Sequence, residues 1–468
     1  MAGFLTRERI VAGPEFNRWL VPPAALAIHL SIGQAYAFSV FKLPLTKVLG
    51  VTQPAPGDWS QPELAWIFTI AIVFLGLSAA MFGRWLERAG PRKSGVAAAV
   101  CWAGGFLVSA VGVRLHNIWL LYLGYGVLGG CGLGLGYITP VSTLIKWFPD
   151  RRGMATGMAI MGFGGGAMIG APLADLLMKH YASPTSVGVA QTFVTMGLIY
   201  FVAMMAGAFL FRVPPPGFTV RPAQHRRAIT AEFAAVRPAM ITPRHVHVDE
   251  AWKTPQFWLL WAVLFLNVSA GIGILEQASP MIQEIFKSRV TASAAAGFVG
   301  LLSLFNMAGR FGWSSLSDRI GRKRTYGVFF TLGPVLYITI PFAGRIGSVI
   351  LFVVAAALII TMYGGGFATV PAYLSDLFGT QFVGAIHGRL LTAWSAAGVA
   401  GPVLVNYIRE YQIEHGVPAA QAYNVTMYIM AALLVIGFLC NLAVRPVGER
   451  HYMTEDQLAR EGAPAAAH

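Results

Sequence analysis

One arginine of this sequence stands deep inside a long apolar stretch. Arg310 precedes the next charged residue, Asp318, by eight residues, which places its guanidinium about 12 Å inside the stretch if the segment is helical. No carboxylate lies one helical turn before it, because the residue at i−4 is Asn306. An unpaired cation is costly in apolar surroundings, so Arg310 must face a polar cavity or a partner. A planar, permanently charged guanidinium is suited to binding a carboxylate through two hydrogen bonds; the alternative is an ion pair with a carboxylate from another helix.

The composition indicates that membrane-spanning helices position this arginine. Hydrophobic residues make up 56% of the 468 residues and charged residues only 12%, against about 25% charged residues in soluble domains. The apolar residues form blocks of roughly 20 or more, the length that a helix needs to cross the hydrocarbon of a bilayer. The predicted fold class is therefore an all-α membrane protein with twelve transmembrane helices in two six-helix halves. The spans are expected near residues 19–43, 62–83, 94–113, 117–145, 154–180, 190–212, 255–280, 293–316, 325–343, 347–375, 389–408 and 425–445.

The positions of the cations predict the orientation. Most of the 34 Lys and Arg residues fall in loops on one side of the predicted spans, and such loops face the cytoplasm in membrane proteins. We therefore expect a multi-pass protein of the cell inner membrane with both termini cytoplasmic. The net charge of +14 is explained by this topology and by contact with the lipid bilayer, without nucleic-acid binding. The three cysteines lie in apolar helices without metal-ligand spacing, and neither a metal nor a cofactor is expected.

An internal repeat with one constant offset relates the two halves. Glu87, Arg88 and Gly90 match Asp318, Arg319 and Gly321; further matches pair Gly134 with Gly365, Pro140 with Pro371, Gly153 with Gly384, and Gly157 with Gly388. Because each half holds six spans, both halves share one orientation, and the substrate site is expected between them.

The repeat also divides the chain into segments. Residues 1–212 and 255–445 are predicted to be the two six-helix bundles, and 213–254 a cytoplasmic linker rich in proline and arginine. Residues 446–468 are predicted to be a cytoplasmic tail without order.

Two copies of a loop motif carry a family resemblance. The segment GRWLERAGPRK (83–93) and its copy SSLSDRIGRK (314–323) resemble the signature that follows helices 2 and 8 of major facilitator transporters. Carboxylates and arginines at a helix end can pair with the opposing bundle and hold the cytoplasmic side closed, while glycines permit close approach. Simple positive-inside charge explains the arginines but neither Glu87 nor Asp318. The predicted gating residues are Gly83, Glu87, Arg88, Gly90, Asp318, Arg319, Gly321 and Arg322.

A narrower resemblance covers most of the chain. The segments GQAYAFSVF (33–41), FPDRRGMATG (148–157), YGGGFATVP (363–371) and HGRLLTAW (387–394) resemble the oxalate/formate antiporter and monocarboxylate transporter branch. The resemblance implies small organic acids as substrates. It further implies that Asn306 stands where several monocarboxylate transporters carry an aspartate, and Trp394 where the oxalate carrier has a second cation. A single cation favours a monocarboxylate over a dicarboxylate.

The same resemblance implies the lining of the pathway. The residues are Gln34 and Tyr36 in helix 1, Tyr125 and Tyr137 in helix 4, Tyr363 and Phe367 in helix 10, and Trp394 in helix 11. They could pack a short hydrocarbon tail while tyrosine hydroxyls bind the acid; the alternative for each aromatic is ordinary packing or a place in the interfacial belt.

Proton coupling requires a titratable group in the pathway. The candidates are Lys42, His29, Glu276 and Asp175, although charges at the outer ends of helices can simply reach toward water. With Asn306 in place of an aspartate, the proton relay of the family cannot be carried over intact.

These observations predict a secondary active transporter rather than an enzyme. Glycine-rich strings lie within apolar helices, and the sequence has neither a phosphate-binding GxxxxGK[ST] loop nor HExxH or GxSxG. The predicted function is transport of a small monocarboxylate such as lactate, pyruvate or formate, coupled to protons, by alternating access. The alternatives are an oxalate/formate-type anion antiporter, with a counter-anion as partner, and a non-transporting membrane receptor.

Overall fold

The computed structural model of the chain describes residues 5–215, 218 and 240–462, and the described part is almost entirely helical. The first span is broken into η2 (Arg18–Leu20), α1 (Val21–Gly33), η3 (Gln34–Ala37) and α2 (Ser39–Leu45), with a bend of 45° before α2. The N-terminal half continues with α3 (Gln61–Ala89), α4 (Pro91–Arg114), α5 (Ile118–Leu121), the π-helical stretch η4 (Tyr122–Gly129), α6 (Gly130–Trp147), α7 (Arg152–Tyr181) and α8 (Val189–Leu210). The C-terminal half contains α11 (Pro255–Phe286), α12 (Ala292–Ile320), α13 (Arg322–Arg345), α14 (Val349–Phe378), α15 (Val383–Leu390), α16 (Thr392–Glu414) and α17 (Asn424–Ala443).

These helices make up the twelve predicted spans. By length and composition, 10 helices of the described chain could cross a membrane, or 11 when the bent first span is included. The remaining span is α12, which is 29 residues long but carries Arg310 and several small polar residues. The predicted all-α fold class is confirmed, and α12 is the eighth span along the chain.

Local sequence signals explain where the helices begin and end. Ser60 and Glu63 form a reciprocal capping box at the start of α3, and the Thr254 hydroxyl accepts a hydrogen bond from the backbone at the start of α11. Gly90 and Gly321 end α3 and α12 with positive φ angles of 87° and 88°, a conformation that glycine adopts without steric cost. The equivalent turn in each half is therefore made by an equivalent glycine.

Several spans are longer than the apolar pattern predicted, and the seventh and eleventh show how. The seventh was expected over 255–280, but α11 continues to Phe286. The eleventh was expected over 389–408, but it begins with α15 at Val383 and continues after a break at Leu391 to the end of α16. Its first turns contain His387, a polar residue just before the predicted start of the span, yet His387 is fully buried.

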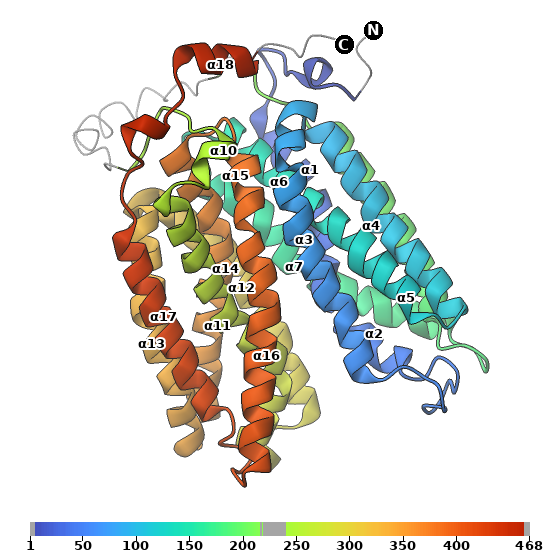
Figure 1. The fold of residues 1–468 in the computed structure, drawn as a ribbon. Helices are drawn as coiled ribbons and strands as arrows, with labels where there is room; N and C mark the ends of the chain where they lie inside the picture. Colours follow the sequence, from blue (N-terminus) through green and yellow to red (C-terminus); the bar gives the residue numbers. More distant parts are fainter. Residues whose placement is uncertain (1–4, 216–217, 219–239, 463–468) are drawn as a thin grey trace.

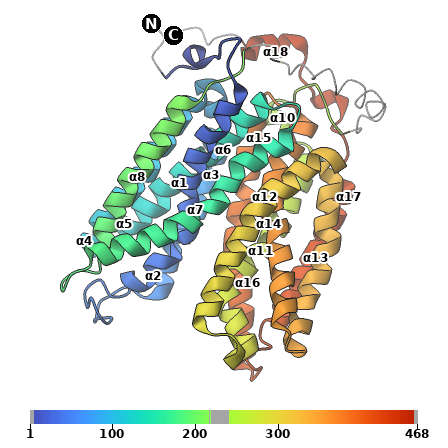
Figure 2. The same ribbon diagram turned by 180° about the vertical axis from the view of Figure 1, so that it is seen from behind.

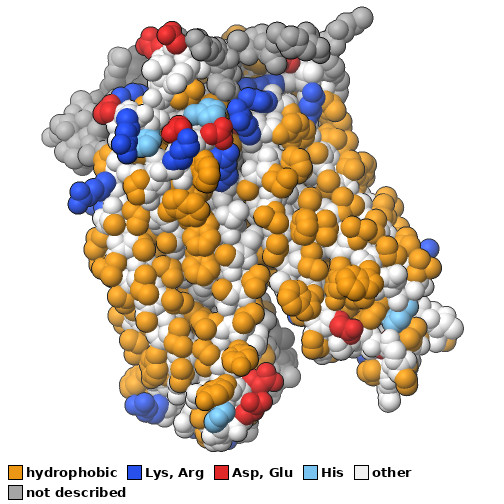
Figure 3. Space-filling model, viewed as in Figure 1, with side chains coloured by type: hydrophobic (Ala, Val, Ile, Leu, Met, Phe, Trp, Pro, Cys, Tyr) orange, Lys and Arg blue, Asp and Glu red, His pale blue; other side chains and the backbone are white. Residues whose placement is uncertain are grey.

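The two halves meet on the side where both termini lie and separate toward the opposite side (Figure 1). We call these the terminal side and the far side. In the reverse view, α7 lies against α12 at the junction of the halves (Figure 2), and α3 packs against α15 in the corresponding place. The space-filling view shows a gap between the halves on the far side and a cluster of charged side chains on the terminal side (Figure 3).

Glycines allow the backbones of the two halves to approach closely. A Cβ atom at Gly157 of α7 would lie 3.0 Å from the Arg310 carbonyl oxygen of α12. A Cβ atom at Gly388 of α15 would lie 2.8 Å from the Ala79 carbonyl carbon of α3. Gly157 and Gly388 are partners in the internal repeat, so the same close contact is made on both sides of the interface.

The linker and the tail pair with each other on the terminal side. The linker contains α10 (Val248–Ala251), and the tail contains η7 (Glu449–His451) and α18 (Glu455–Gly462). Arg244 forms an ion pair with Glu449 at 2.5 Å, and the Met453 N–H donates to the His245 carbonyl at 2.8 Å. The expectation of a tail without order is therefore wrong for residues 446–462, because these hydrogen bonds hold it to the linker. Residues 216–217, 219–239 and 463–468 lie outside the described part.

Closure of the terminal side requires a residue without a side chain at Gly388. We expect Gly388→Val to force α15 away from α3, because backbone rather than a flexible side chain fills the space. In a cysteine-free background, Ser142→Cys reports the closure, since Ser142 is buried where α6 meets Gly384 of the other half. A thiol reagent applied to the terminal side should label this cysteine several-fold faster in Gly388→Val. Gly312→Ala is the control, because its Cβ would meet nothing within 4 Å; equal labelling of both variants would contradict the role of the contact.

Candidate functional site

Arg310 lies fully buried on α12 at the junction of the halves. Its Nε donates to Asn306 Oδ1 at 3.0 Å, as their spacing of one helical turn permits. Its two terminal nitrogens, Nη1 and Nη2, make no hydrogen bond within the described structure. The alternative of an ion pair is not realised, because none of the described Asp and Glu side chains pairs with Arg310. The site therefore presents a cation whose two strongest donors are unused.

Aromatic rings from both halves enclose this guanidinium. Its Cζ lies 5.7 Å from the ring centroid of Phe163 on α7 and 5.2 Å from that of Phe367 on α14, within the range of cation–π attraction. Trp394 of α16 packs on both rings, at centroid distances of 5.4 Å from Phe163 and 4.5 Å from Phe367. It also contacts Tyr137 of α6 at 5.3 Å. We call Phe163, Phe367, Trp394, Tyr137, Tyr36 and Tyr363 the aromatic cage.

Glycine runs on two helices make room for the arginine stem. A Cβ atom at Gly164 would lie 3.1 Å from both Cδ and Nε of Arg310. A Cβ atom at Gly364 would lie 2.6 Å from Asn306 Oδ1 and 3.1 Å from Arg310 Cγ. These glycine strings therefore serve helix contact and, in addition, shape the site.

A hydrogen bond between tyrosines of opposite halves covers the far side of the cage. The hydroxyls of Tyr36 and Tyr363 lie 3.2 Å apart; Tyr36 is partly exposed and Tyr363 is buried. Tyr363 lies near the middle of α14, whereas Arg310 lies closer to the terminal end of α12. The contact therefore stands between the guanidinium and the gap seen in Figure 3.

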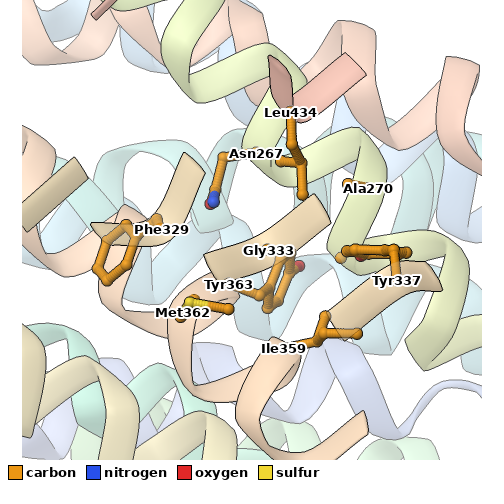
Figure 4. Close-up of a pocket in the computed structure, with 10 residues that line it drawn as sticks. Asn267, Ala270, Phe329, Gly333, Tyr337, Ile359, Met362, Tyr363 and Leu434 are labelled. Atoms are coloured by element: carbon orange, nitrogen blue, oxygen red, sulfur yellow. The ribbon is translucent and has the colours of Figure 1, made fainter. Parts of the chain in front are cut away.

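The ring of Tyr363 also lines a small cavity inside the C-terminal half (Figure 4). This cavity of about 10 Å³ is lined by Asn267, Gly271 and Tyr337, among others. Asn267 Oδ1 and the Tyr337 hydroxyl have no hydrogen-bond partner within the described structure. The space suits one water molecule between them, so Tyr363 separates a small polar void from the cage.

The polar atoms left unpartnered around Arg310 are mostly donors. They comprise Nη1 and Nη2 of Arg310, Nε1 of Trp394 and the Tyr137 hydroxyl. Arginine and tryptophan nitrogens can only donate, whereas a carboxylate can only accept. A buried donor without a partner is costly, so this set is satisfied by an acceptor-rich, negatively charged ligand.

Not every predicted lining residue reaches this cage. Gln34 Oε1 accepts from the Tyr125 hydroxyl at 3.2 Å, and Tyr125 packs on Phe38 and Trp102. This cluster lies inside the N-terminal half. The structure describes no contact between Arg310 and either Gln34 or Tyr125, so their place in the substrate site stays a prediction.

The coupling candidates occupy different surroundings. His29 is fully buried beside Tyr137, whereas Lys42 is partly exposed on α2. Asp175 forms an exposed i,i+4 ion pair with Lys179 at 2.6 Å. The side chain of Glu276 lies outside the described residues. Among the described candidates, His29 alone borders the cage.

Sequence reasoning missed two residues at the site. Phe163 contacts Arg310, and His387 is fully buried with both ring nitrogens unpartnered, 5.8 Å from the Tyr137 ring. Phe163 could have been found, because the repeat offset relates it to Trp394. His387 opens the segment HGRLLTAW (387–394) that carries the narrower family resemblance, and that motif was the signal that could have marked it.

The predicted gating carboxylates cap helices of the opposite half. Asp318 of α12 accepts hydrogen bonds from the N–H groups of Gly153 and Met154, both at 2.8 Å, at the start of α7. Glu87 of α3 accepts from the Gly384 N–H at 2.9 Å, at the start of α15. A carboxylate at a helix N-terminus satisfies free N–H groups and complements the helix dipole. The two caps are related by the internal repeat.

Ion pairs surround each cap. Asp376 of α14 pairs with Arg152 of α7 at 3.1 Å and with Arg322 at 3.0 Å, while Arg322 also pairs with Asp318 at 2.6 Å. Glu87 pairs with Lys146 of its own half. Of the remaining predicted gating residues, Arg88 and Arg319 are exposed, whereas Gly83 packs against the Ala385 backbone.

The linker adds a further contact between the halves. Asp249 of α10 pairs with Arg84 of α3 at 3.1 Å and with Arg389 of α15 at 2.6 Å. The hydrogen bond from Arg389 and the charges of both arginines lower the pKa of Asp249 below its ordinary value. The carboxylate therefore stays ionised and bridges α3 and α15 at neutral pH.

Comparisons with known proteins agree with this architecture. The family model described as Major Facilitator Superfamily matches residues 24–402 and 313–467. The chain is 26% identical to the oxalate:formate antiporter of Oxalobacter formigenes, covering 82% of this chain and 83% of that protein. It is also 26% identical to human monocarboxylate transporter 11, covering 84% and 77%. The crystal structure of the E. coli fucose:proton symporter FucP superposes with a TM-score of 0.62 at 14% identity, covering 92% of this chain and all of that one.

The cap by Asp318 gives a prediction about the terminal side. Asp318→Asn removes the charge and leaves an amide that cannot accept as strongly from two N–H groups, a loss of about 1.5–3 kcal/mol. We expect the terminal side to open more often, which labelling of Ser142→Cys from that side measures as an increase of roughly tenfold. Asp175→Asn, an exposed carboxylate on α7, is the matched control. Unchanged labelling in Asp318→Asn would leave its carboxylate without a role in closure.

Proposed function

This chain belongs to the Major Facilitator Superfamily, and from that membership we propose that it is a secondary active transporter of small monocarboxylates such as lactate, pyruvate or formate, taken up together with protons. The observation that carries the proposal is Arg310, a fully buried guanidinium at the junction of the halves with two unused terminal nitrogens. A carboxylate is the simplest ligand that satisfies both nitrogens in one plane.

The surroundings of Arg310 favour one carboxylate and a short apolar tail. Within the described cage Arg310 is the sole cation, and Trp394 fills the neighbouring position on helix 11 with an indole. A second carboxylate there would lack a counter-charge in a low-dielectric site. The Trp394 N–H and the Tyr137 hydroxyl can add hydrogen bonds to the first carboxylate, while the rings of Phe163 and Phe367 pack against the tail.

The relatives support this class of substrate. One is named for exchanging oxalate and formate, and another for transporting monocarboxylates. Both names denote small carboxylic acids, so the donor set around Arg310 and the names of the relatives point to the same chemistry.

In an alternating-access cycle, the structure corresponds to one of the states of the carrier. With the terminal side assigned to the cytoplasm of the inner membrane by the positive-inside pattern, the state described here opens outward. The anion enters from the far side, displaces the hydrogen bond between Tyr36 and Tyr363, and binds Arg310. Release requires the caps at Asp318 and Glu87 to part, which opens the opposite side.

An anion antiporter is the second candidate, favoured by the relative that exchanges oxalate for formate. The two candidates share the site and differ in what resets the carrier. A symporter returns empty, whereas an antiporter returns with a counter-anion bound.

The proposed role of Arg310 predicts a graded loss of transport. Arg310→Lys keeps the charge but loses the two-pronged geometry, which should weaken binding by about 1.5–3 kcal/mol and reduce uptake at least tenfold. Arg310→Gln should reduce uptake further, because the anion then loses its counter-charge. The protein should still fold, since no buried carboxylate is left unpaired.

Uptake of labelled lactate, pyruvate and formate into proteoliposomes is the measurement, with thermal unfolding as the check of folding. Arg345→Gln, an arginine at the far end of α13, serves as the matched control. Normal transport by Arg310→Gln would rule out the proposed carboxylate site.

Coupling predicts a distinct response to gradients. An inward proton gradient should drive accumulation of the acid in proteoliposomes, because each anion enters with a proton. A protonophore should abolish accumulation yet leave the exchange of labelled for unlabelled substrate intact. Accumulation that ignores pH but needs an internal anion would instead establish the antiporter.

A further inference from the structure

His29 occupies an unusual position next to the cage. It lies fully buried on α1, and both nitrogens of its ring face backbone carbonyl oxygens. Nδ1 lies 2.5 Å from the Ala159 oxygen of α7, and Nε2 lies 3.2 Å from the Tyr137 oxygen of α6. Both carbonyls belong to helices of the N-terminal half.

This geometry suits an imidazolium better than a neutral ring. A neutral imidazole carries one N–H, so one of its nitrogens presents a lone pair to a carbonyl that can only accept. An imidazolium carries two N–H groups and donates to both carbonyls. Protonation of His29 therefore completes two hydrogen bonds in a site that excludes water.

Burial and, more weakly, a neighbouring charge oppose protonation of His29 while the site is empty. The loss of hydration on burial is the larger cost of a charge on the ring, and Arg310 from α12 adds a positive charge nearby; His387 from α15 lies within electrostatic range. Tyr137 from α6 stacks at 5.3 Å, and α7 contributes the uncharged ring of Phe163 at 6.5 Å. The contact from α8 on this part of α1 is made by Gly207. Within the described structure, no carboxylate faces His29.

A bound carboxylate shifts this balance toward the protonated ring. When an anion pairs with Arg310, its negative charge offsets the repulsion between the guanidinium and an imidazolium. We propose that His29 is the proton-binding residue of the carrier and that it takes up its proton together with the anion that binds Arg310. This proposal rests on the proposed function, since it requires an anion at Arg310. The proton comes from solution and remains on the imidazole until the anion leaves, so no covalent bond of the substrate changes.

The division of the two ligands between the halves explains how they are coupled. The anion is held by Arg310 of the C-terminal half, and the proton by a ring fixed to α1, α6 and α7 of the N-terminal half. Each ligand raises the affinity for the other by the same factor, because binding linkage is reciprocal. The pair of ligands thus stabilises a state in which the two halves lie close around the site.

Proton uptake on binding tests this assignment. Purified full-length protein in weakly buffered detergent solution with a pH indicator is mixed with lactate, pyruvate or formate, and the anion that binds is used. At a pH at which His29 is neutral in the empty site and protonated in the occupied one, found by scanning from about pH 8 downward, we expect about one proton to be taken up per anion bound by the wild-type protein. His29→Gln should bind the anion and take up none. His415→Gln, an exposed histidine at the end of α16, should behave as the wild type.

The outcomes separate this inference from the function on which it rests. Undiminished proton uptake by His29→Gln, or loss of uptake in His387→Gln instead, would overturn the role of His29 and leave monocarboxylate transport standing. Failure of the wild type to bind any of the three anions would overturn both.

A second measurement needs no variant. If His29 is neutral in the empty site, the anion affinity of the wild type should fall about tenfold for each unit of increasing pH. A flat profile would contradict the inference even if His29→Gln does not fold.

Discussion

The unpaired guanidinium of Arg310 constrains the rest of the molecule. A buried cation without a carboxylate is tolerated only where the surroundings compensate for lost hydration. Here the compensation is partial, since it consists of one hydrogen bond from Arg310 to Asn306 and the faces of Phe163 and Phe367. At Gly164 of α7 and Gly364 of α14 the arginine stem and Asn306 occupy the space that a side chain would need.

Much of the architecture could be predicted, because nearly every residue of a membrane span must be apolar enough to lie in lipid or in the protein interior. The apolar blocks gave the twelve helices, and the position of Arg310 singled it out as the centre of a site. The start of helix 11 was placed too late, since His387 is buried between the halves, and a hydropathy pattern detects burial in lipid but not burial of a polar side chain within protein. The tail was expected to lack order because its composition is polar, yet its partner is the linker, and no local pattern records that pairing.

The candidate site was predicted in part. The cage residues Tyr36, Tyr137, Tyr363, Phe367 and Trp394 come together around Arg310, whereas Gln34 and Tyr125 pack within one half. The difference depends on which face of each helix turns toward the partner half. The break after α1 and the π-helical stretch before α6 rotate these faces, and the 3.6-residue pattern of the sequence does not record such a rotation. The surroundings of His29 depend on backbone carbonyls, which no residue type reveals.

The reciprocal caps of Asp318 and Glu87 also bear on the energy of the conformational cycle. When the halves part on the terminal side, the N–H groups at the starts of α7 and α15 and the two carboxylates become hydrated instead of bonding to one another. Exchange of a charge-assisted hydrogen bond within the protein for bonds to water changes the free energy by only about 1.5–3 kcal/mol per bond, although the geometry changes greatly. The caps therefore stabilise the closed side without locking it, because hydration recovers most of what each separated group loses.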